Sequence, residues 1–494
     1  MGSSTWTRRD FVAALAALPA VFKGDPYRPA VGSSLVGGAV RVRGRVMSLG
    51  RGLARVGVSD GLTVVRTDPD GRFDLVTDAT RRYLSLSAPA GYQLPISATG
   101  TIKSFLPIAA DRRGEMVAAF NLTPIPEGDE RHAFLLLADI QTQDAADMDH
   151  FRRETLPDLS ATLKGLSGVP AFGVGDGDIM WDRLALYDDY EAMVKQLGIP
   201  FVQVVGNHDL DLGEQTDEGS TTTFERCFGP RYHSFNRGQV HYVVLDDVFY
   251  YGGGYLGYLD RDQLTWLAND LALVEKGSPV VVFTHIPLMS AFPTRQGTKT
   301  PPVANYVVNR ELAYRLLAPY QTTILTGHIH ESAIGHDGGV TERNHGAVCG
   351  GWWTGDICYD GTPNGYGVYQ VDGSEIRWRH QATGQPATHQ IRGYPRGADP
   401  TAPEEIVANV WAHEPGWKVL WYEEGVAKGA MAQRIGLDPL AVERLAGDQL
   451  PAKRPWVDPV RTGHLFYARP SATAGQIRVE ATDPWGRTFV DDVR

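Results

Sequence analysis

Short apolar runs that alternate with segments of helical spacing, from about residue 131 onward, limit the possible folds of this chain more than any other feature. The first predicted strands are Ala133–Leu137, Ala171–Val174 and Phe201–Val205, because each is a short apolar run bounded by polar or turn-forming residues. Apolar residues between 186 and 197 recur at helical spacing. Further strands are expected at Val240–Leu245, Pro279–Phe283 and Thr322–Leu325. This alternation predicts an α/β layered core with central β-sheets flanked by helices.

The segments on either side of this core are predicted to be β-rich. From 34 to 125, short runs are separated by turn signals such as Asp68-Pro69-Asp70-Gly71, which predicts an N-terminal β-sandwich domain. A C-terminal β-rich domain is expected from 386 to 494, which leaves 126–385 for the core. We expect the N-terminal sandwich to have a structural or positioning role, with glycan binding as the alternative.

The first 33 residues have the pattern of a targeting segment. Arg8 and Arg9 precede an unbroken apolar run from Phe11 to Phe22. As a helix this run would rise about 18 Å, which is short of the roughly 30 Å bilayer core. Residues 1–33 resemble a twin-arginine signal peptide, which implies export to the periplasm, the cell surface or the exterior. A frayed amphipathic helix is the alternative, and we expect no transmembrane span.

The composition excludes several classes of protein. Hydrophobic residues make up 43% and charged residues 21% of the 494 residues, as in ordinary globular proteins. The net charge of −11 argues against a nucleic-acid partner. Cys227, Cys349 and Cys358 are too few for a disulfide framework, and the sequence leaves open whether Cys349 and Cys358 pair.

Polar residues that can bind metal follow the predicted core strands directly. Loops at the carboxyl ends of strands are where open α/β sheets build ligand sites. We therefore expect one common site from these side chains. They are Asp139, Gln141, Asp178, Asn207, His208, His285, His328 and His330.

The spacing of these residues suits a metal site. Asp139 with Gln141, and His328 with His330, are two positions apart, so in extended segments both members of each pair would point to one face. Nearby glycines permit tight turns; they are Gly177, Gly206 and Gly327. Carboxylate, amide oxygen and imidazole together suit first-row divalent metals. A carboxylate between two such ions can bridge them.

The motif order D-x-Q, G-D, G-N-H-D, H-x-P and G-H-x-H resembles the calcineurin-like metallophosphoesterases. Flanking segments such as Phe228-Gly229-Pro230 and Gly361-Thr362-Pro363-Asn364-Gly365-Tyr366 are similar to a bacterial three-domain subfamily, in which N- and C-terminal β domains surround the core. The resemblance covers about residues 34–494. Gln141 departs from the family pattern, which usually has histidine there.

The resemblance implies a pair of divalent metal ions (Mn, Fe, Zn or Mg) and assigns their ligands. The first ion would be held by Asp139, Gln141, Asp178 and His330. The second would be held by Asp178, Asn207, His285 and His328, with Asp178 bridging the two. His208 would be the catalytic residue beside the phosphate, where it stabilises the phosphate or protonates the leaving oxygen. Asp176 is the alternative bridging residue, because Gly175-Asp176 also reads as G-D.

The resemblance implies an exported binuclear-metal phosphoesterase. It would hydrolyse phosphoric mono- or diesters, of small-molecule or cell-envelope origin, by in-line attack of a metal-bridging hydroxide. One alternative is a non-catalytic surface protein that binds a metal or phosphate ligand through a degraded site, which Gln141 alone supports. Another is an adhesion module formed by the β domains. The sequence leaves open whether Trp352-Trp353 and the aromatic residues of 249–258 are ordinary packing or line the site.

Overall fold

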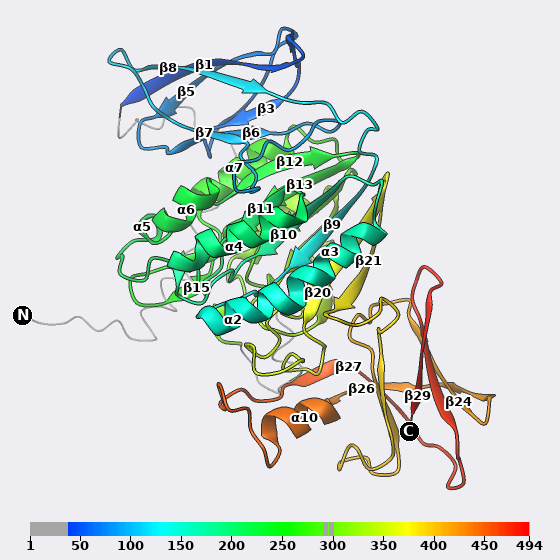
Figure 1. The fold of residues 1–494 in the computed structure, drawn as a ribbon. Coiled ribbons are helices and arrows are strands. Elements are labelled where there is room, and N and C mark those ends of the chain that lie inside the picture. The colour runs from blue at the N-terminus through cyan, green and yellow to red at the C-terminus, as the bar shows by residue number, and fades with distance from the viewer. Residues whose placement is uncertain (1–37, 290–294, 296–300, 494) are drawn as a thin grey trace, which may run out of the picture.

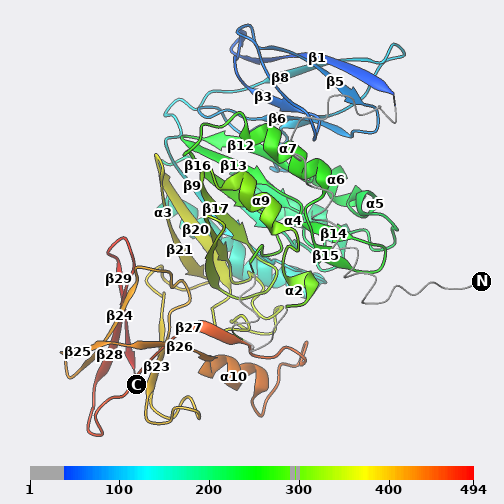
Figure 2. The same ribbon diagram turned by 180° about the vertical axis from the view of Figure 1, so that it is seen from behind.

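The computed structural model describes residues 38–289, 295 and 301–493. Figure 1 and Figure 2 show a central body with one β-rich unit at each end, the N-terminal unit at the top and the C-terminal unit at the bottom. The twin-arginine-like segment lies outside the described residues. Within the described ranges, the structure has no helix long and apolar enough to cross a membrane.

The central body is built on two mixed sheets. The first has the order β11-β10-β9-β20-β21, in which β9, β10 and β11 are parallel and β20 is antiparallel to β9. Its strands are β9 (Arg131–Leu137), β10 (Ala171–Asp176), β11 (Phe201–Val204), β20 (Gly365–Asp372) and β21 (Glu375–Ala382). The second has the order β12-β13-β16-β17-β19-β18, with β13, β16, β17 and β19 parallel. Its strands are β12 (His233–Arg237), β13 (Val240–Val244), β16 (Pro279–Phe283), β17 (Gln321–Thr326), β18 (Ala333–Asp337) and β19 (Val340–Asn344).

Aromatic side chains from both sheets form the layer between them. Phe134 of β9 stacks on Tyr369 of β20 at 4.4 Å between ring centroids, and it meets Tyr242 and Phe283 of the second sheet edge to face. These side chains are fully buried. Burial on this scale, together with the favoured edge and stacked geometries, fixes the spacing of the two sheets.

Helices cover the outer faces of the two sheets. Figure 1 shows α2, α3 and α4 over the first sheet, and Figure 2 shows α7 and α9 over the second. Asp260 caps α7 by accepting from the backbone N–H of Gln263. The helices are α2 (Ala145–His150), α3 (Leu156–Gly165), α4 (Tyr187–Val194), α5 (Asp217–Ser220), α6 (Thr222–Phe228), α7 (Arg261–Leu271) and α9 (Arg310–Leu317). A π-helical turn (Phe151–Thr155) joins α2 to α3, single 3-10 turns (Leu184–Leu186, Lys195–Leu197) flank α4, and another lies at Val303–Asn305.

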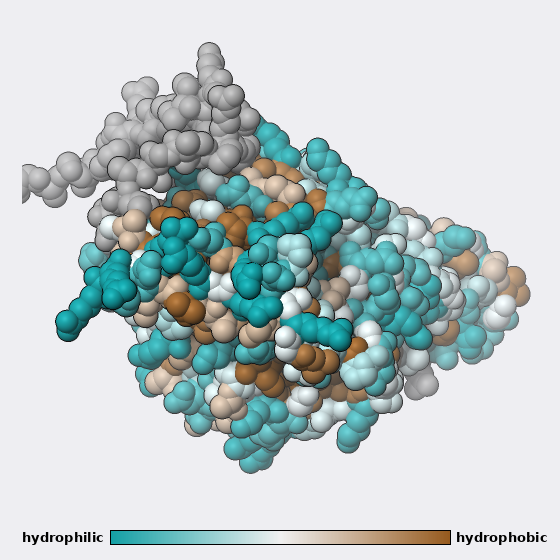
Figure 3. Space-filling model, turned by 90° about the horizontal axis from the view of Figure 1, so that it is seen from above, coloured by the Kyte–Doolittle hydropathy of each residue, from teal (hydrophilic) through white to brown (hydrophobic). Residues whose placement is uncertain are grey.

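The N-terminal unit is the predicted β-sandwich. One sheet pairs β1 with β2, β5 and β8, and the other has the order β4-β3-β6-β7. The strands are β1 (Ala39–Ser48), β2 (Arg51–Gly52), β3 (Gly57–Ser59), β4 (Val64–Arg66), β5 (Arg72–Asp78), β6 (Tyr83–Ser87), β7 (Phe105–Pro107) and β8 (Glu115–Asn121). The outer sheet exposes ion pairs such as Arg41–Asp74 and Arg43–Glu115. Figure 3 views the molecule from this end and shows hydrophilic side chains interspersed with hydrophobic ones.

The C-terminal unit is also β-rich. Its sheets have the orders β22-β23-β27-β26 and β25-β24-β28-β29, and they enclose a small core that includes Ile406, Phe466 and Val479. Its elements are β22 (Arg392–Tyr394), β23 (Ile406–Asn409), β24 (Lys418–Glu423), β25 (Val426–Ala430), β26 (Ala432–Leu437), α10 (Pro439–Ala446), β27 (Arg461–Ala468), β28 (Ile477–Thr482) and β29 (Thr488–Val493). The predicted fold class, an α/β core between two β-rich units, is therefore confirmed.

Candidate metal centre

The side chains expected in the site come from the carboxyl ends of five strands. Asp139 and Gln141 follow β9, Asp178 follows β10, and Asn207 lies just after β11. The three histidines follow β16 and β17 of the second sheet; they are His285, His328 and His330. Because the carboxyl ends of parallel strands share an edge, the two sheets deliver these side chains to one place.

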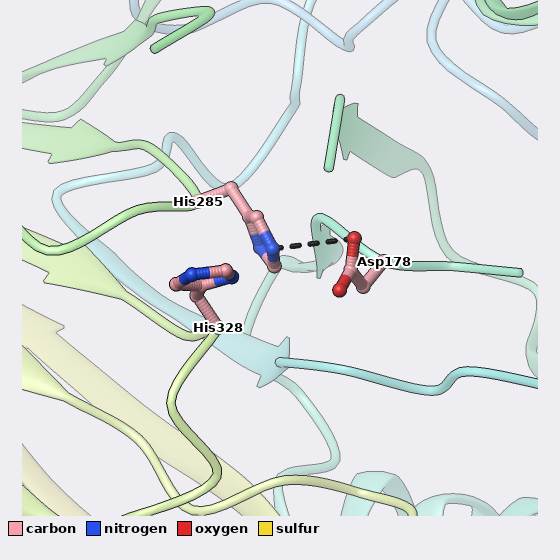
Figure 4. A group of neighbouring side chains, drawn as sticks. All are labelled: Asp178, His285 and His328. Atoms are coloured by element: carbon pink, nitrogen blue, oxygen red, sulfur yellow. Dashed lines mark ion pairs between the residues drawn. The ribbon is translucent and has the colours of Figure 1, made fainter. Parts of the chain in front are cut away.

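Asp178, His285 and His328 form the centre of this group (Figure 4). One ligand atom from each lies within 4.8 Å of the others. Asp178 Oδ1 is 3.2 Å from His285 Nε2, and the rings of His285 and His328 are 5.0 Å apart at a steep angle. The arrangement presents one carboxylate and two imidazoles to a common point.

The other four expected ligands join this centre from two sides. Asn207 Oδ1 is 3.2 Å from His285 Nε2, which places it with the histidines of the second set. On the other side, the Gln141 amide nitrogen donates to Asp178 Oδ2 at 2.8 Å. His330 Nε2 lies 3.5 Å from Asp139 Oδ1. Asp139 also accepts from the backbone N–H of His328 at 2.8 Å, so these contacts link the seven residues into one group, in which Asp178 contacts both His285 and Gln141.

Hydrogen bonds to the backbone fix which ring nitrogen faces the site. His285 Nδ1 lies 3.1 Å from the Asp176 carbonyl, and His330 Nδ1 lies 2.7 Å from the Gly350 carbonyl, so each leaves Nε2 for a ligand. His328 is reversed: its Nε2 bonds to the Ala304 carbonyl at 2.9 Å, and its buried Nδ1 has no hydrogen-bond partner. A buried ring nitrogen without a partner is costly unless something else binds it.

The local backbone differs from the sequence-based expectation. Asp139 and Gln141 have φ of 51° and 42°, and His328 and His330 have φ of 71° and 49°. The expected extended segments are therefore wrong, because these residues adopt left-handed backbone. Asp178 does the same, with φ of 48°. Non-glycine residues avoid this region, and such strain concentrates at functional sites that the surrounding structure holds in place.

Three glycines make room for the expected ligands. A Cβ at Gly177 would collide with the His285 ring, one at Gly206 would collide with the Asp178 carboxylate, and one at Gly327 would collide with the Asp139 carboxylate. Gly177 also has φ of 80°. The sequence analysis expected these glycines to permit tight turns, and the left-handed backbone of Gly177 agrees with that; at all three positions the structure adds close approach to a ligand side chain as a reason for glycine.

The residues present fit a pair of divalent ions. Carboxylate, imidazole and amide groups converge, one buried imidazole nitrogen has no partner, and glycines clear the space around the donors. Asp176, the alternative bridging residue, ends β10 with both carboxylate oxygens buried and without hydrogen-bond partners, and it is not a member of the Asp178–His285–His328 group.

Charges within the group shift the pKa values of its members. Burial alone would raise the pKa of Asp178, but nearby His285 and His208 hold it well below its usual range. Burial would lower the pKa of His285, yet the Asp178 carboxylate outweighs it and raises the pKa to about 10. The pKa of His328 falls to about 4, because burial and the neighbouring His285 both disfavour its charged form.

Three family models match the chain over most of its length. The model for the calcineurin-like phosphoesterase matches residues 132–332. The models for the N terminal and the C terminal of calcineurin-like phosphoesterase match residues 40–125 and 342–489. The chain belongs to the calcineurin-like phosphoesterases. This family comprises metal-dependent phosphoric ester hydrolases that use a binuclear divalent metal centre.

Several proteins of known name are similar to parts of this calcineurin-like phosphoesterase. The serine/threonine-protein phosphatase CPPED1 of Mus musculus is 32% identical over 189 residues, which are 35% of this chain and 57% of the relative. The chain thus spans little more than half the length of that relative. CPPED1 of Homo sapiens is 26% identical over 251 residues, 45% of this chain and 77% of the relative. The solved purple acid phosphatase PPD1 of yellow lupin is 12% identical, covers 67% of this chain and 68% of its own, and has a TM-score of 0.37.

His208, the expected catalytic residue of this phosphoesterase, lies at the edge of the group. Its backbone N–H donates to Asp178 Oδ1 at 2.8 Å, and its Nδ1 lies 2.9 Å from Asp182 Oδ1. Burial would lower the pKa of His208, but Asp178 and Asp182 together raise it above its ordinary value. The ring is held in place and is favoured in its protonated form, as a proton donor requires.

Asp209 is a positioning residue that sequence reasoning missed. Its carboxylate accepts from the backbone N–H groups of Ile179, Met180 and Gly206, each at 3.0 Å. It therefore ties the loop that carries Asp178 to the loop that carries Asn207 and His208. The Tyr187 hydroxyl also donates to this carboxylate, at 3.0 Å. The signal was available in the G-N-H-D motif, but a carboxylate that ties loops together through backbone N–H groups cannot be recognised from residue type alone.

The structure locates the aromatic and cysteine residues whose roles the sequence left open. Trp353 is buried and its indole N–H donates to the Ile140 carbonyl, whereas Trp352 is half-buried and donates to His330 Nε2 at 3.2 Å. A metal bound at that nitrogen would replace this last hydrogen bond. The aromatic loop contains β14 (Val248–Tyr250), which pairs with β15 (Tyr255–Gly257). The ring centroid of Tyr255 lies 6.0 Å from that of His328.

The three cysteines are free thiols, so Cys349 and Cys358 do not pair.

Proposed function

We propose that this chain is an exported enzyme that uses two divalent ions to hydrolyse phosphoric mono- or diesters by in-line displacement. The main support is the position of Asp178: its Oδ1 faces His285, and its Oδ2 faces Gln141. A carboxylate whose two oxygens point to different donor sets is placed to bridge two ions. When bound, the ions lower the pKa of water and neutralise charge on the phosphoryl group.

The chain's own residues divide into two proposed ligand sets and one proton donor. Asp139, Gln141 and His330 form one set with Asp178, and Asn207, His285 and His328 form the other. His208 stands outside both and holds a proton that Asp182 and Asp178 stabilise. Its proposed role is to bind the phosphate and to protonate the leaving oxygen at the end of the displacement.

The test is hydrolysis by protein reconstituted with Mn²⁺, Fe²⁺, Zn²⁺ or Mg²⁺. We expect release of p-nitrophenol from p-nitrophenyl phosphate, from bis(p-nitrophenyl) phosphate, or from both. Asp178→Asn should lose this activity, whereas Asp188→Asn, at an exposed position of α4, should keep it. If metal-loaded protein hydrolysed neither ester, the chain would be a metal- or phosphate-binding protein and the proposal would be wrong.

We also propose export by the twin-arginine route, on the strength of Arg8-Arg9 and the apolar run that follows. Replacing both arginines with lysine should keep the folded chain inside the cell. Arg112-Arg113, an exposed arginine pair in the N-terminal sandwich, supplies the control, because the same change there should leave export intact. Normal export of the Arg8→Lys, Arg9→Lys chain would refute the route.

The proposed domains are 34–125, 126–385 and 386–494. The grouping of strands into separate sheets supports this division, since β21 is the last strand of the core sheets and the C-terminal sheets begin with β22. The proposed substrate is a small-molecule or cell-envelope phosphoester.

A further inference from the structure

Three tryptophans from distant parts of the chain meet beside the metal centre. Trp181 lies in the loop after β10, Trp352 lies after β19, and Trp456 comes from the C-terminal unit, between α10 and β27. The Trp181 and Trp352 ring centroids are 4.0 Å apart, and those of Trp352 and Trp456 are 4.4 Å apart. We refer to these three residues as the tryptophan cluster.

Ion pairs to a buried carboxylate hold the segment that carries Trp456 in place. Arg454 donates to Asp147 Oδ2 of α2 at 2.7 Å, and it also donates to the Trp352 carbonyl. Its guanidinium lies 4.4 Å from the Trp181 ring centroid, which is cation–π distance. Lys453 adds a second bond to Asp147, at 2.5 Å. These contacts pin residues 453–456 against the phosphoesterase core.

The same contacts argue against an anion-binding role for this segment. The positive charges of Arg454 and Lys453 are matched by Asp147 and by Asp144, which Lys453 also contacts. The cationic groups are therefore already paired, and what the segment adds to the site is aromatic surface. Trp456 is 53% exposed, while Trp181 and Trp352 are partly exposed.

The cluster lies on the side of the metal centre where the leaving group would depart. His208, the proposed donor to the leaving oxygen, has its ring 5.9 Å from Trp181 and 6.1 Å from Trp352. A group attached to that oxygen would therefore lie within reach of these rings. The cluster is therefore in a position to contact the alcohol part of the substrate, whereas the phosphate belongs to the metal ligands.

We propose that the tryptophan cluster is a specificity subsite for phosphoesters whose leaving alcohol carries a flat aromatic ring, and that the C-terminal unit completes it through Trp456. This proposal rests on the proposed function. The planes of Trp352 and Trp456 meet at 82°, and those of Trp181 and Trp352 at 72°. A flat ring can stack on one such face and present its edge to the next, which are the two favoured aromatic geometries.

The experiment compares two leaving alcohols of equal size that differ in flatness. Benzyl phosphate and cyclohexylmethyl phosphate both release a primary alcohol, so bond cleavage makes similar demands on the metals and on His208. Each is assayed as the monoester and as the methyl diester, with release of the larger alcohol measured. The wild-type enzyme should show a higher kcat/KM for the benzyl compound.

Variants of Trp456 separate the subsite from the chemistry. Trp456→Ala should lower kcat/KM for the benzyl ester roughly five- to tenfold, with little change for the cyclohexylmethyl ester. Trp456→Phe should restore most of the preference. Trp485→Ala, in a turn of the C-terminal unit under Arg487, is the control and should leave the ratio of the two esters unchanged.

The outcomes separate the two proposals. Hydrolysis of both esters with a ratio that Trp456→Ala leaves unchanged would overturn the subsite and leave the phosphoesterase proposal standing. A preference for the cyclohexyl ring that Trp456→Ala abolishes would overturn the flat-ring specificity. Metal-loaded enzyme that releases neither alcohol would contradict the proposed function, and the subsite would fall with it.

Discussion

Asp182 Oδ1 lies 2.9 Å from His208 Nδ1, which leaves Nε2 as the ring nitrogen that would face a leaving group. Asp182 follows Asp178 by four positions, so one loop supplies both the proposed bridging ligand and the partner of the proposed acid. The position of the proposed catalytic imidazole is thereby coupled to that of the proposed metal ligands. The carboxylate also helps to raise the pKa of His208.

Replacing Asp182 with Asn should lower the fraction of His208 that is protonated, without removing the metals. The neutral amide no longer stabilises the imidazolium, so the pKa of His208 falls and the alkaline limb of the kcat–pH profile moves to lower pH. His208→Ala removes the acid altogether and should lower kcat by roughly 10²–10⁴-fold with the metal content unchanged. Asp188→Asn is the surface control. An Asp182→Asn enzyme with an unshifted profile would contradict this role.

Gln141 should set the metal preference of one site. Its amide oxygen now lies 3.6 Å from Cys349 Sγ while its nitrogen faces Asp178, and rotation of the amide by half a turn exchanges the two. An amide oxygen is a harder and weaker ligand than imidazole, so this site should favour Mn²⁺, Fe²⁺ or Mg²⁺ over Zn²⁺. Calorimetric titration of Gln141→His should show tighter binding and a shift toward Zn²⁺. Unchanged affinities and preference would mean that Gln141 is not a ligand.

A buried histidine away from the site should make stability depend on pH. His132 Nδ1 lies 2.8 Å from the Asp129 carbonyl and Nε2 lies 2.6 Å from the Tyr242 hydroxyl, partners that satisfy both nitrogens of the neutral ring. Burial lowers its pKa to about 4, below the ordinary 6.5. The unfolded chain therefore binds the extra proton first as the pH falls. The stabilisation is complete above 6.5 and declines toward pH 4, by about 1.4 kcal/mol per unit and about 3 kcal/mol in all.

Urea unfolding across this pH range measures that effect. His132→Gln has no titrating group, so its free energy of unfolding should fall less steeply between pH 6.5 and 4 than that of the wild type. His336→Gln, at an exposed position of β18, should keep the wild-type slope. Equal slopes in the wild type and in His132→Gln would show that His132 does not contribute.

The sequence predicted the positions of the site better than its local geometry. Strand ends could be read from apolar runs, and the parallel strands of the two sheets then brought Asp139, Asp178 and His285 to one place. The left-handed backbone of Asp139 and His328 could not be read, because it opposes local preference and exists only where surrounding contacts impose it. Trp456 was missed for a different reason, since it reaches the site by contacts between units that no local pattern records.

The fold shows the same contrast between features with a local sequence signal and features that depend on their neighbours. The parallel strands β9, β10 and β11 were predicted as short apolar runs, each with its own signal. β20 and β21 were not predicted, although they complete the first sheet beside β9. Polar residues and glycines interrupt both strands, as in Gly365–Asp372, and their pairing is decided by the neighbouring strand.

Titration of metal-free protein with Mn²⁺, with bound metal and ester hydrolysis measured on the same samples, tests the central claim most directly. The two ligand sets differ, since one has two histidines and the other has Gln141, so they should fill in turn. We predict two bound ions per chain, with hydrolysis nearly absent through the first equivalent and rising with the second. Full activity with one ion bound, or saturation at fewer than two ions, would contradict a binuclear centre bridged by Asp178.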